Sequence, residues 1–171
     1  NVIYVGTGEA PELVGKYIVR RFEGDAVLRS MITEVEAYRG EEDLGCHASK
    51  GRTPRTEIMY HNGGVIYVYL IYGMYWMLNF VTGQAGDASA VLIRGIDDIY
   101  GPGRVGKILQ LDRSFYGEKL GLSNRIWLED TGTIPSFTTH PRIGIHYAGE
   151  PWVSMPWRFV LERSLTETEG L

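Results

Sequence analysis

The stretch V-I-Y-V-Y-L-I-Y-G-M-Y-W-M-L-N-F-V, residues 65 to 81, decides the fold of this chain. It is rich in β-branched and aromatic residues and carries one turn residue, Gly73, near its middle, which predicts a β-hairpin rather than a helix. A tip with Tyr72 beside Gly73 places a large amphipathic ring in solvent. Because such a ring is costly to leave uncovered, we expect the tip to contact a partner.

The register of this hairpin follows from its loop length, because side chains alternate between faces with period two. With a two-residue loop, Tyr69 lies opposite Trp76 and Asn79 points to the other face. With a three-residue loop, Tyr72 to Met74, Gly73 supplies a positive φ and Tyr67 lies opposite Asn79. The second register places Tyr69 opposite Met77 and gathers two phenols and one amide on one face, and we favour it.

The composition narrows the classes of protein. A chain of 171 residues is large enough for one domain with a substantial core. The net charge of −4 and pI of about 5.6 differ from the basic surplus usual in nucleic-acid binders, although local patches steer binding more than totals do. The single cysteine, Cys46, excludes an internal disulfide and a multi-cysteine zinc site, and it indicates a reducing setting.

No membrane span or secretion signal is expected. The run at 65 to 81 is too short and too rich in tyrosine to cross a bilayer, and the start N-V-I-Y-V-G lacks a basic region. The polar tail from Thr166 to Leu171 is expected to be frayed.

Two strands precede the hairpin, at 13 to 22 and 26 to 38, joined by a turn at 23 to 25. Alternation along the second strand places two carboxylates and a phenol on one face. From spacing alone, a solvated polar face is a better interpretation than a catalytic site. The residues predicted to share this face are Ile32, Glu34, Glu36 and Tyr38.

The segment from Arg39 to Asn62 changes to an acidic and then a basic loop, and long loops in compact domains usually carry function. Its cations can contact phosphates or can equally form a solvated charge run. His47 beside Cys46 lacks metal-ligand spacing to another histidine, so a hydrogen-bonded histidine is expected and no metal. The cations are Lys50, Arg52 and Arg55.

A short strand at 88 to 94 ends at Arg94, and an arginine in that place usually faces an acid or a phosphate. The following segment G-P-G-R-V-G-K-I-L-Q-L, residues 101 to 111, predicts a helix. Its glycine-rich start could bind an anion, although ordinary capping explains it better.

Further strands are predicted at 125 to 129, 143 to 147 and 157 to 161. With strands dominant and no βαβ alternation, the predicted class is α+β: a single domain with a curved antiparallel or mixed sheet, few helices and a protruding hairpin. The sequence contains no Ser-His-Asp elbow, Walker loop or dinucleotide fingerprint.

The chain resembles the alkyladenine (3-methyladenine, methylpurine) DNA glycosylases over nearly its whole length. The matching motifs are E-V-E-A-Y at 34 to 38, H-A-S-K-G-R-T-P-R at 47 to 55, Y-V-Y-L-I-Y-G-M-Y at 67 to 75 with Asn79, V-L-I-R at 91 to 94, G-P-G at 101 to 103, and P-R-I-G-I with A-G-E between 141 and 150. The hairpin motif is highly specific.

The resemblance implies a monofunctional base-excision-repair enzyme, one domain over residues 1 to 171, that flips out alkylated or deaminated purines. The class covers 3-methyladenine, 7-methylguanine, hypoxanthine and ethenoadenine, and hydrolysis of the N-glycosidic bond leaves an abasic site. No cofactor or metal is implied, and no lysine is placed for a Schiff base.

The resemblance also implies a role for each matched position. Glu36 is the general base with Arg94 beside the water, and Tyr72 enters the minor groove. The base is enclosed by Tyr38, His47 and Tyr69, Tyr67 supports His47, and Asn79 lines the pocket floor. The implied phosphate contacts are Lys50, Arg52, Arg55, Arg104 and Lys107.

Two other classes remain open. A non-catalytic nucleic-acid-binding module could use the same aromatic face, but it gains nothing from Glu36 beside a polyanion. A hydrolase of free nucleosides or sugars has no use for a protruding Tyr72. The expected partner is double-stranded DNA with damaged purines, bound by a monomer in the cytoplasm of a bacterium, near the nucleoid, or in a eukaryotic nucleus.

Overall fold

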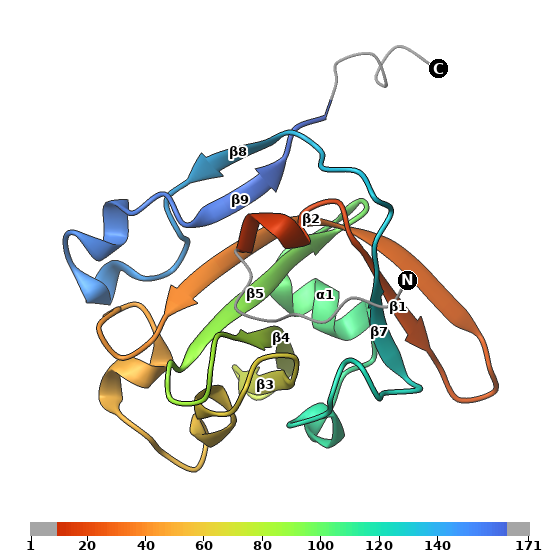
Figure 1. Ribbon diagram of the computed structural model, residues 1–171, viewed down its shortest axis with the longest axis horizontal. Helices are drawn as coiled ribbons and strands as arrows, with labels where there is room; N and C mark the ends of the chain where they lie inside the picture. Colours follow the sequence, from red (N-terminus) through yellow and green to blue (C-terminus); the bar gives the residue numbers. More distant parts are fainter. Residues whose placement is uncertain (1–9, 164–171) are drawn as a thin grey trace.

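The computed structural model describes residues 10 to 163, and in this range the chain forms one curled antiparallel sheet with a single α-helix (Figure 1). Neighbouring strands of the main path follow the order β3-β4-β5-β2-β1-β7. No helix in this range is long and apolar enough to span a membrane. The strands are β1 Tyr17–Arg21, β2 Val27–Arg39, β3 Ile66–Ile71, β4 Tyr75–Thr82, β5 Ser89–Ile96, β6 Ile99–Tyr100, β7 Ile126–Glu129, β8 Phe137–His140 and β9 Arg158–Leu161; the helix is α1 Pro102–Ile108.

Strand β2 is the spine of the sheet. Its first half pairs with β1, its second half pairs with β9 on the same side, and β5 pairs along its other side. The antiparallel pair of β8 and β9 therefore extends the sheet beside the second half of β2 (Figure 1). The predicted α+β class with a curved antiparallel sheet and few helices is confirmed.

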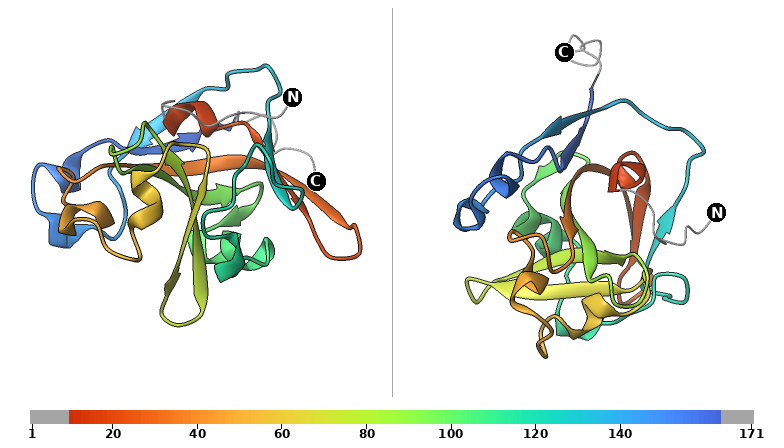
Figure 2. Two further views of the ribbon diagram at one scale, coloured as in Figure 1. Left: turned by 60° about the horizontal axis from the view of Figure 1, so that its bottom comes forward. Right: turned by 60° about the vertical axis from the view of Figure 1, so that its left-hand side comes forward.

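The β3–β4 hairpin has the three-residue loop. Tyr67 lies opposite Asn79 and Tyr69 opposite Met77, and the Met74 amide donates to the Ile71 carbonyl at 3.1 Å. Tyr72 and Gly73 both take positive φ, 54° and 67°. The predicted register is therefore confirmed, and the hairpin extends away from the rest of the sheet (Figure 2, left).

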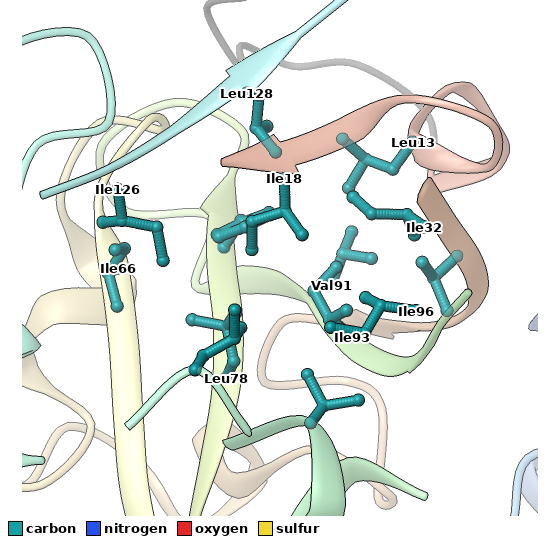
Figure 3. Packing of buried hydrophobic residues seen from close by; sticks show 14 of the residues in the cluster. Leu13, Ile18, Ile32, Ile66, Leu78, Val91, Ile93, Ile96, Ile126 and Leu128 are labelled. Carbon is teal, nitrogen blue, oxygen red and sulfur yellow. The ribbon is translucent and has the colours of Figure 1, made fainter. Parts of the chain in front are cut away.

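The concave side of the curled sheet is filled by aliphatic side chains (Figure 3). Ile18 from β1, Ile32 from β2 and Ile93 from β5 are fully buried there. Helix α1 packs against β4 and β5, and Gly106 permits this, because an added Cβ would lie only 1.8 Å from the Trp76 carbonyl oxygen. The core thus holds the strands that carry the polar cavity described below.

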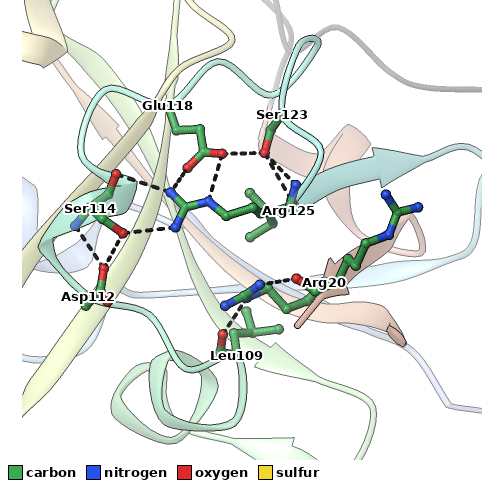
Figure 4. Close-up of polar contacts among 9 residues, drawn as sticks. Arg20, Leu109, Asp112, Ser114, Glu118, Ser123 and Arg125 are labelled. Carbon is green, nitrogen blue, oxygen red and sulfur yellow. Dashed lines mark hydrogen bonds and ion pairs between the residues drawn. The ribbon is translucent and has the colours of Figure 1, made fainter. Parts of the chain in front are cut away.

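A polar cluster fixes the long connection between α1 and β7 (Figure 4). Arg125 pairs with Glu118 and donates to the Ser114 hydroxyl at 3.0 Å, while its guanidinium lies over the Phe115 ring. Arg20 on β1 donates to the Leu109 carbonyl at 2.8 Å. These contacts are away from the cavity and hold the connection to the sheet.

Three details differ from the sequence prediction. Residues 13 to 16 are not strand, because a 3₁₀ helix Ala10–Leu13 leads into Gly15, whose φ of 86° breaks an extended chain. Residues 143 to 147 are not a strand but lead into the 3₁₀ helix His146–Ala148, and β8 instead pairs with β9. The loop from 39 to 62 holds two short 3₁₀ helices, His47–Lys50 and Glu57–Tyr60.

The shared face of β2 is also corrected. The pairing of β2 with β5 shifts register on both sides of Glu34, so the alternation is broken there. Ile32 and Val35, three residues apart, both lie in the core, and Ile32 does not share a face with Glu36. The predicted fray at 166 to 171 lies outside the described residues.

Candidate active site

A cavity of about 550 Å³ opens at the base of the β3–β4 hairpin. Its walls come from β2, β3, β4 and β5, from the start of α1, and from residues 143 to 147. The predicted residues that line it are Glu36, Tyr38, His47, Arg55, Tyr67, Tyr69, Tyr72, Asn79, Arg94 and Arg104. The structure thus brings together every residue predicted for chemistry or for base binding.

Glu36 is the carboxylate of this cavity. Its side chain is 0% exposed, and its Oε2 accepts the Ile143 backbone amide at 2.6 Å. Its Oε1 accepts the Tyr38 hydroxyl at 3.1 Å and Arg94 at the longer distance of 3.4 Å. Burial raises the pKa of Glu36, although Arg94 and the Ile143 amide act against that rise.

Arg94 enters the cavity from an irregular point of β5. In the pairing with β2, Glu34 lies opposite Gly95 and Val35 opposite Ile93, so Arg94 has no partner position. Bulges of this kind re-aim side chains next to functional sites. Strand β5 continues past Arg94 to Ile96, so the predicted end of the strand at Arg94 is wrong. The predicted acid partner is found twice: Arg94 Nε donates to Glu34 at 3.1 Å, and Arg94 Nη1 donates to Glu36.

Aromatic rings form the walls. Tyr38 on β2 and Tyr69 on β3 flank the cavity, and the His47 ring lies edge-on to Tyr69 with centroids 4.6 Å apart. Tyr67 and His47 Nδ1 share a hydrogen bond of 3.0 Å. Burial lowers the pKa of His47 to about 4, so the ring is neutral at neutral pH.

Asn79 is the buried amide of the cavity. Its Nδ2 donates to the Tyr67 carbonyl at 3.2 Å and lies 3.5 Å from the Met77 carbonyl oxygen. These two bonds fix the orientation of the amide in the wall formed by β3 and β4. A fixed amide of this kind can discriminate between the polar edges of a bound molecule.

Tyr72 at the hairpin tip is 84% exposed and lies at the rim of the cavity. Of the predicted phosphate contacts, Arg55 and Arg104 line the rim, and Lys50 and Lys107 are exposed outside it. Arg52 is held differently, because both its Nε and its Nη2 donate to the Glu57 carboxylate at 2.7 and 2.6 Å.

Sequence reasoning missed three features around Glu36. The Ile143 amide is a backbone group, so its role does not depend on the type of side chain at that position. Arg142, next to it, forms a fully buried ion pair with Asp43, and Tyr147 donates from the cavity rim to the Gly45 carbonyl at 2.9 Å. The P-R-I-G-I motif contains both Arg142 and Ile143, and this was the available signal. No group of three or more His, Cys, Asp or Glu within residues 10 to 163 could hold a metal ion.

Comparison with known proteins identifies the family. The family model described as methylpurine-DNA glycosylase (MPG) matches residues 7–100 and 97–165. The chain belongs to the methylpurine-DNA glycosylase family. A Psychrobacter cryohalolentis protein named "Putative 3-methyladenine DNA glycosylase" is 43% identical over 170 residues, which cover 82% of this chain and 80% of the relative.

Proteins of the same name from two other organisms are similar to this chain. The one from Legionella pneumophila strain Corby is 43% identical over 162 residues, 90% of this chain and 87% of the relative. The one from Methanocella arvoryzae is 39% identical over 171 residues, 88% and 84% of the two chains. Membership of the methylpurine-DNA glycosylase family makes the chain a DNA glycosylase of base excision repair and a DNA-binding protein, and it sets aside the two alternative classes.

Proposed function

We propose that this DNA glycosylase removes alkylated or deaminated purines from double-stranded DNA, as a monomer, by hydrolysis with a water activated by Glu36. The observation that carries the proposal is a carboxylate with no exposed surface that still lines a cavity of about 550 Å³. Such a volume lies within the range of small-molecule sites, and it accommodates a purine and its sugar.

The chemistry follows from the hydrogen bonds of Glu36. Oε2 accepts one bond, from the Ile143 amide, and Oε1 accepts the Tyr38 hydroxyl and a long contact from Arg94. An ionised carboxylate offers about four acceptor positions, so with three donors bound Glu36 can still accept a proton from water. The water oxygen attacks C1′, the glycosidic bond breaks with its electron pair passing to the purine nitrogen, and the negative charge stabilises an oxocarbenium-like sugar.

A hydrolytic, monofunctional reaction is supported by the cavity lining. A lyase step by Schiff-base chemistry needs an amine at the sugar, and no lysine lines the cavity within the described residues. The two lysines predicted to contact phosphates, Lys50 and Lys107, do not line it. Water is thus the nucleophile that the site supports.

The walls suit a flat, electron-poor base. Tyr38, His47 and Tyr69 offer aromatic faces and edges, and stacking of a base on such rings is worth about 1–3 kcal/mol each. A cationic alkylated purine gains further from the phenol rings, and the neutral His47 does not repel it. Asn79 would disfavour a purine 2-amino group at the floor.

Base flipping is supported by the hairpin tip. A base stacked in duplex cannot reach a buried carboxylate, so it must leave the helix at a cost of a few kcal/mol. Tyr72 is fully presented at the rim and can fill the space that the base leaves. A poorly paired damaged base lowers the cost, which gives selectivity before any pocket contact.

The test is a panel of duplex oligonucleotides, each carrying one lesion: 3-methyladenine, 7-methylguanine, hypoxanthine or ethenoadenine. Incubation is followed by alkaline cleavage at abasic sites. We expect cleavage of one or more of these duplexes at the lesion, and strand breaks only after alkali. Breaks before alkali would contradict the monofunctional reaction, and release from none would contradict the substrate class.

A further inference from the structure

Glu36 belongs to a chain of four charged side chains that crosses three strands. Arg158 Nη1 on β9 lies 3.3 Å from Glu34 Oε1, and Arg94 Nε on β5 lies 3.1 Å from the same oxygen. Arg94 Nη1 then lies 3.4 Å from Glu36 Oε1. Arg94 is thus shared by two carboxylates, and the closer contact goes to Glu34.

This chain of charges lies where the pairing of β2 with β5 shifts register on both sides of Glu34. The register shift leaves both Thr33 and Arg94 without partner positions and sets Glu34 opposite Gly95. The position of Gly95 admits no side chain, because a Cβ there would lie 2.8 Å from Thr33 Oγ1 and 3.2 Å from Glu34 Cβ. On the other side, Arg158 lies opposite Glu36 in register and reaches diagonally to Glu34.

We propose that Glu34 is a positioning residue for the reaction, and that Glu34 and Arg158 together set how much of the Arg94 charge is available to Glu36. This inference rests on the proposed role of Glu36 as the base. Glu34 holds Arg94 by Nε, and Arg94 Nη1 lies 3.4 Å from Glu36 Oε1. Arg158 in turn pairs with Glu34, which weakens the attraction between Glu34 and Arg94.

The electrostatic consequence has a definite sign. Loss of the Glu34 charge leaves Arg94 less compensated, which favours ionised Glu36; loss of the Arg158 charge has the opposite effect. Tyr phenols contribute no charge near neutral pH, because burial raises the pKa of Tyr38 and Tyr69. The groups that face Glu36 are Arg94 from β5, Tyr38 from β2, Tyr69 from β3, and Arg142 and Tyr147 from the connection between β8 and β9.

The test measures single-turnover base release against pH for Glu34→Gln and Arg158→Gln with a lesion that the wild-type chain cleaves. Both substitutions remove the Glu34–Arg158 ion pair, and Glu34→Gln also removes the Glu34–Arg94 ion pair. We expect the acidic midpoint to move by about half to one pH unit, downward for Glu34→Gln and upward for Arg158→Gln. Glu34→Gln should also slow the plateau rate by about tenfold, because Arg94 loses its closer anchor.

Controls separate this inference from the proposed function. Glu129→Gln removes a carboxylate on β7 that pairs with Arg29 on β2; neither residue lines the cavity, and the profile should stay unchanged. Arg158→Lys keeps the charge and should keep the wild-type midpoint. Thermal melts of each variant over the same pH range establish that the chain stays folded.

Equal or absent midpoint shifts in the two Gln variants would overturn the positioning role, since a purely structural ion pair predicts the same effect from either side. That result, together with an inactive Glu36→Gln, would leave the proposed base intact. An active Glu36→Gln would instead overturn the proposed function itself. If one Gln variant fails to fold, the direction of the shift in the other still decides.

Discussion

Two buried carboxylates lie beside arginines in this molecule, and they differ in how fully their oxygens are hydrogen-bonded. Asp43 accepts two bonds from Arg142, at 2.6 and 2.8 Å, and two backbone amides, from Arg39 and Gly45. Glu36 is equally buried, but its arginine stands at 3.4 Å and its side chain lines a cavity. A buried carboxylate with all its hydrogen-bond positions filled forms a structural ion pair, whereas one with a position unfilled next to a cavity can react with a bound molecule.

The largest effect is expected on catalysis, from the substitution Glu36→Gln. Glutamine at position 36 keeps the shape but cannot take a proton from water or present a full charge to the sugar. Glu36→Gln should reduce single-turnover base release by about 10² to 10⁴-fold or more. Binding to lesion DNA should stay equal or tighten slightly, since a negative charge near phosphates is removed. Gel-shift titration and quenched-flow release measure the two quantities.

On the other side of the comparison, Asp43→Asn should act on stability. It leaves the Arg142 guanidinium buried without its counter-charge, and Arg142 Nε already has no partner. Breaking a buried pair in this way costs about 3–5 kcal/mol. Urea unfolding of Asp43→Asn should show this loss, whereas Glu36→Gln should be close to wild type. A larger loss for Glu36→Gln would reverse the assignment of the two roles.

Tyr72→Ala should have a smaller effect, limited to extrusion of the base. Removing the ring should make the flipped state less favourable by about 1–3 kcal/mol, by the scale of aromatic stacking. Release from a stably paired lesion should therefore fall more than release from a mismatched or single-stranded one. Leu70→Ala, which removes another exposed apolar side chain of the hairpin away from the tip, is the matched control. Equal losses on all three substrates would exclude the wedge role.

The smallest effect concerns the cations on and around the rim of the cavity. In the described part of the chain, carboxylate ion pairs are found for Arg52 but not for Lys50, Arg55, Arg104 or Lys107. About four phosphate contacts predict a slope of log affinity against log salt on the order of −3 to −4. Lys107→Met should reduce the slope by about 1, and Arg52→Met should leave it unchanged. A slope near zero would mean that the chain binds DNA without these cations.

The sequence predicted the hairpin and its face, because alternation, one turn glycine and a three-residue loop determine which side chains meet. It could not separate Glu34 from Glu36, since both lie on the same side of β2 and only the bulge and the Ile143 amide distinguish them. Pairing between Asp43 and Arg142 spans 99 residues and leaves no periodic trace. The strand expected at 143 to 147 is wrong for a related reason: its apolar alternation serves a cavity rim and an amide donor rather than a ladder.

The pH dependence of single-turnover base release by the wild-type chain, with Glu36→Gln beside it, tests most directly whether Glu36 is the base. Only the ionised carboxylate can accept a proton, and burial raises the pKa of Glu36. The wild-type rate should therefore fall as pH drops through that raised pKa, after subtraction of spontaneous depurination, and Glu36→Gln should show a low rate without this fall. An identical acidic fall in Glu36→Gln, or a rate near that of the wild type, would contradict the role of Glu36 as the base.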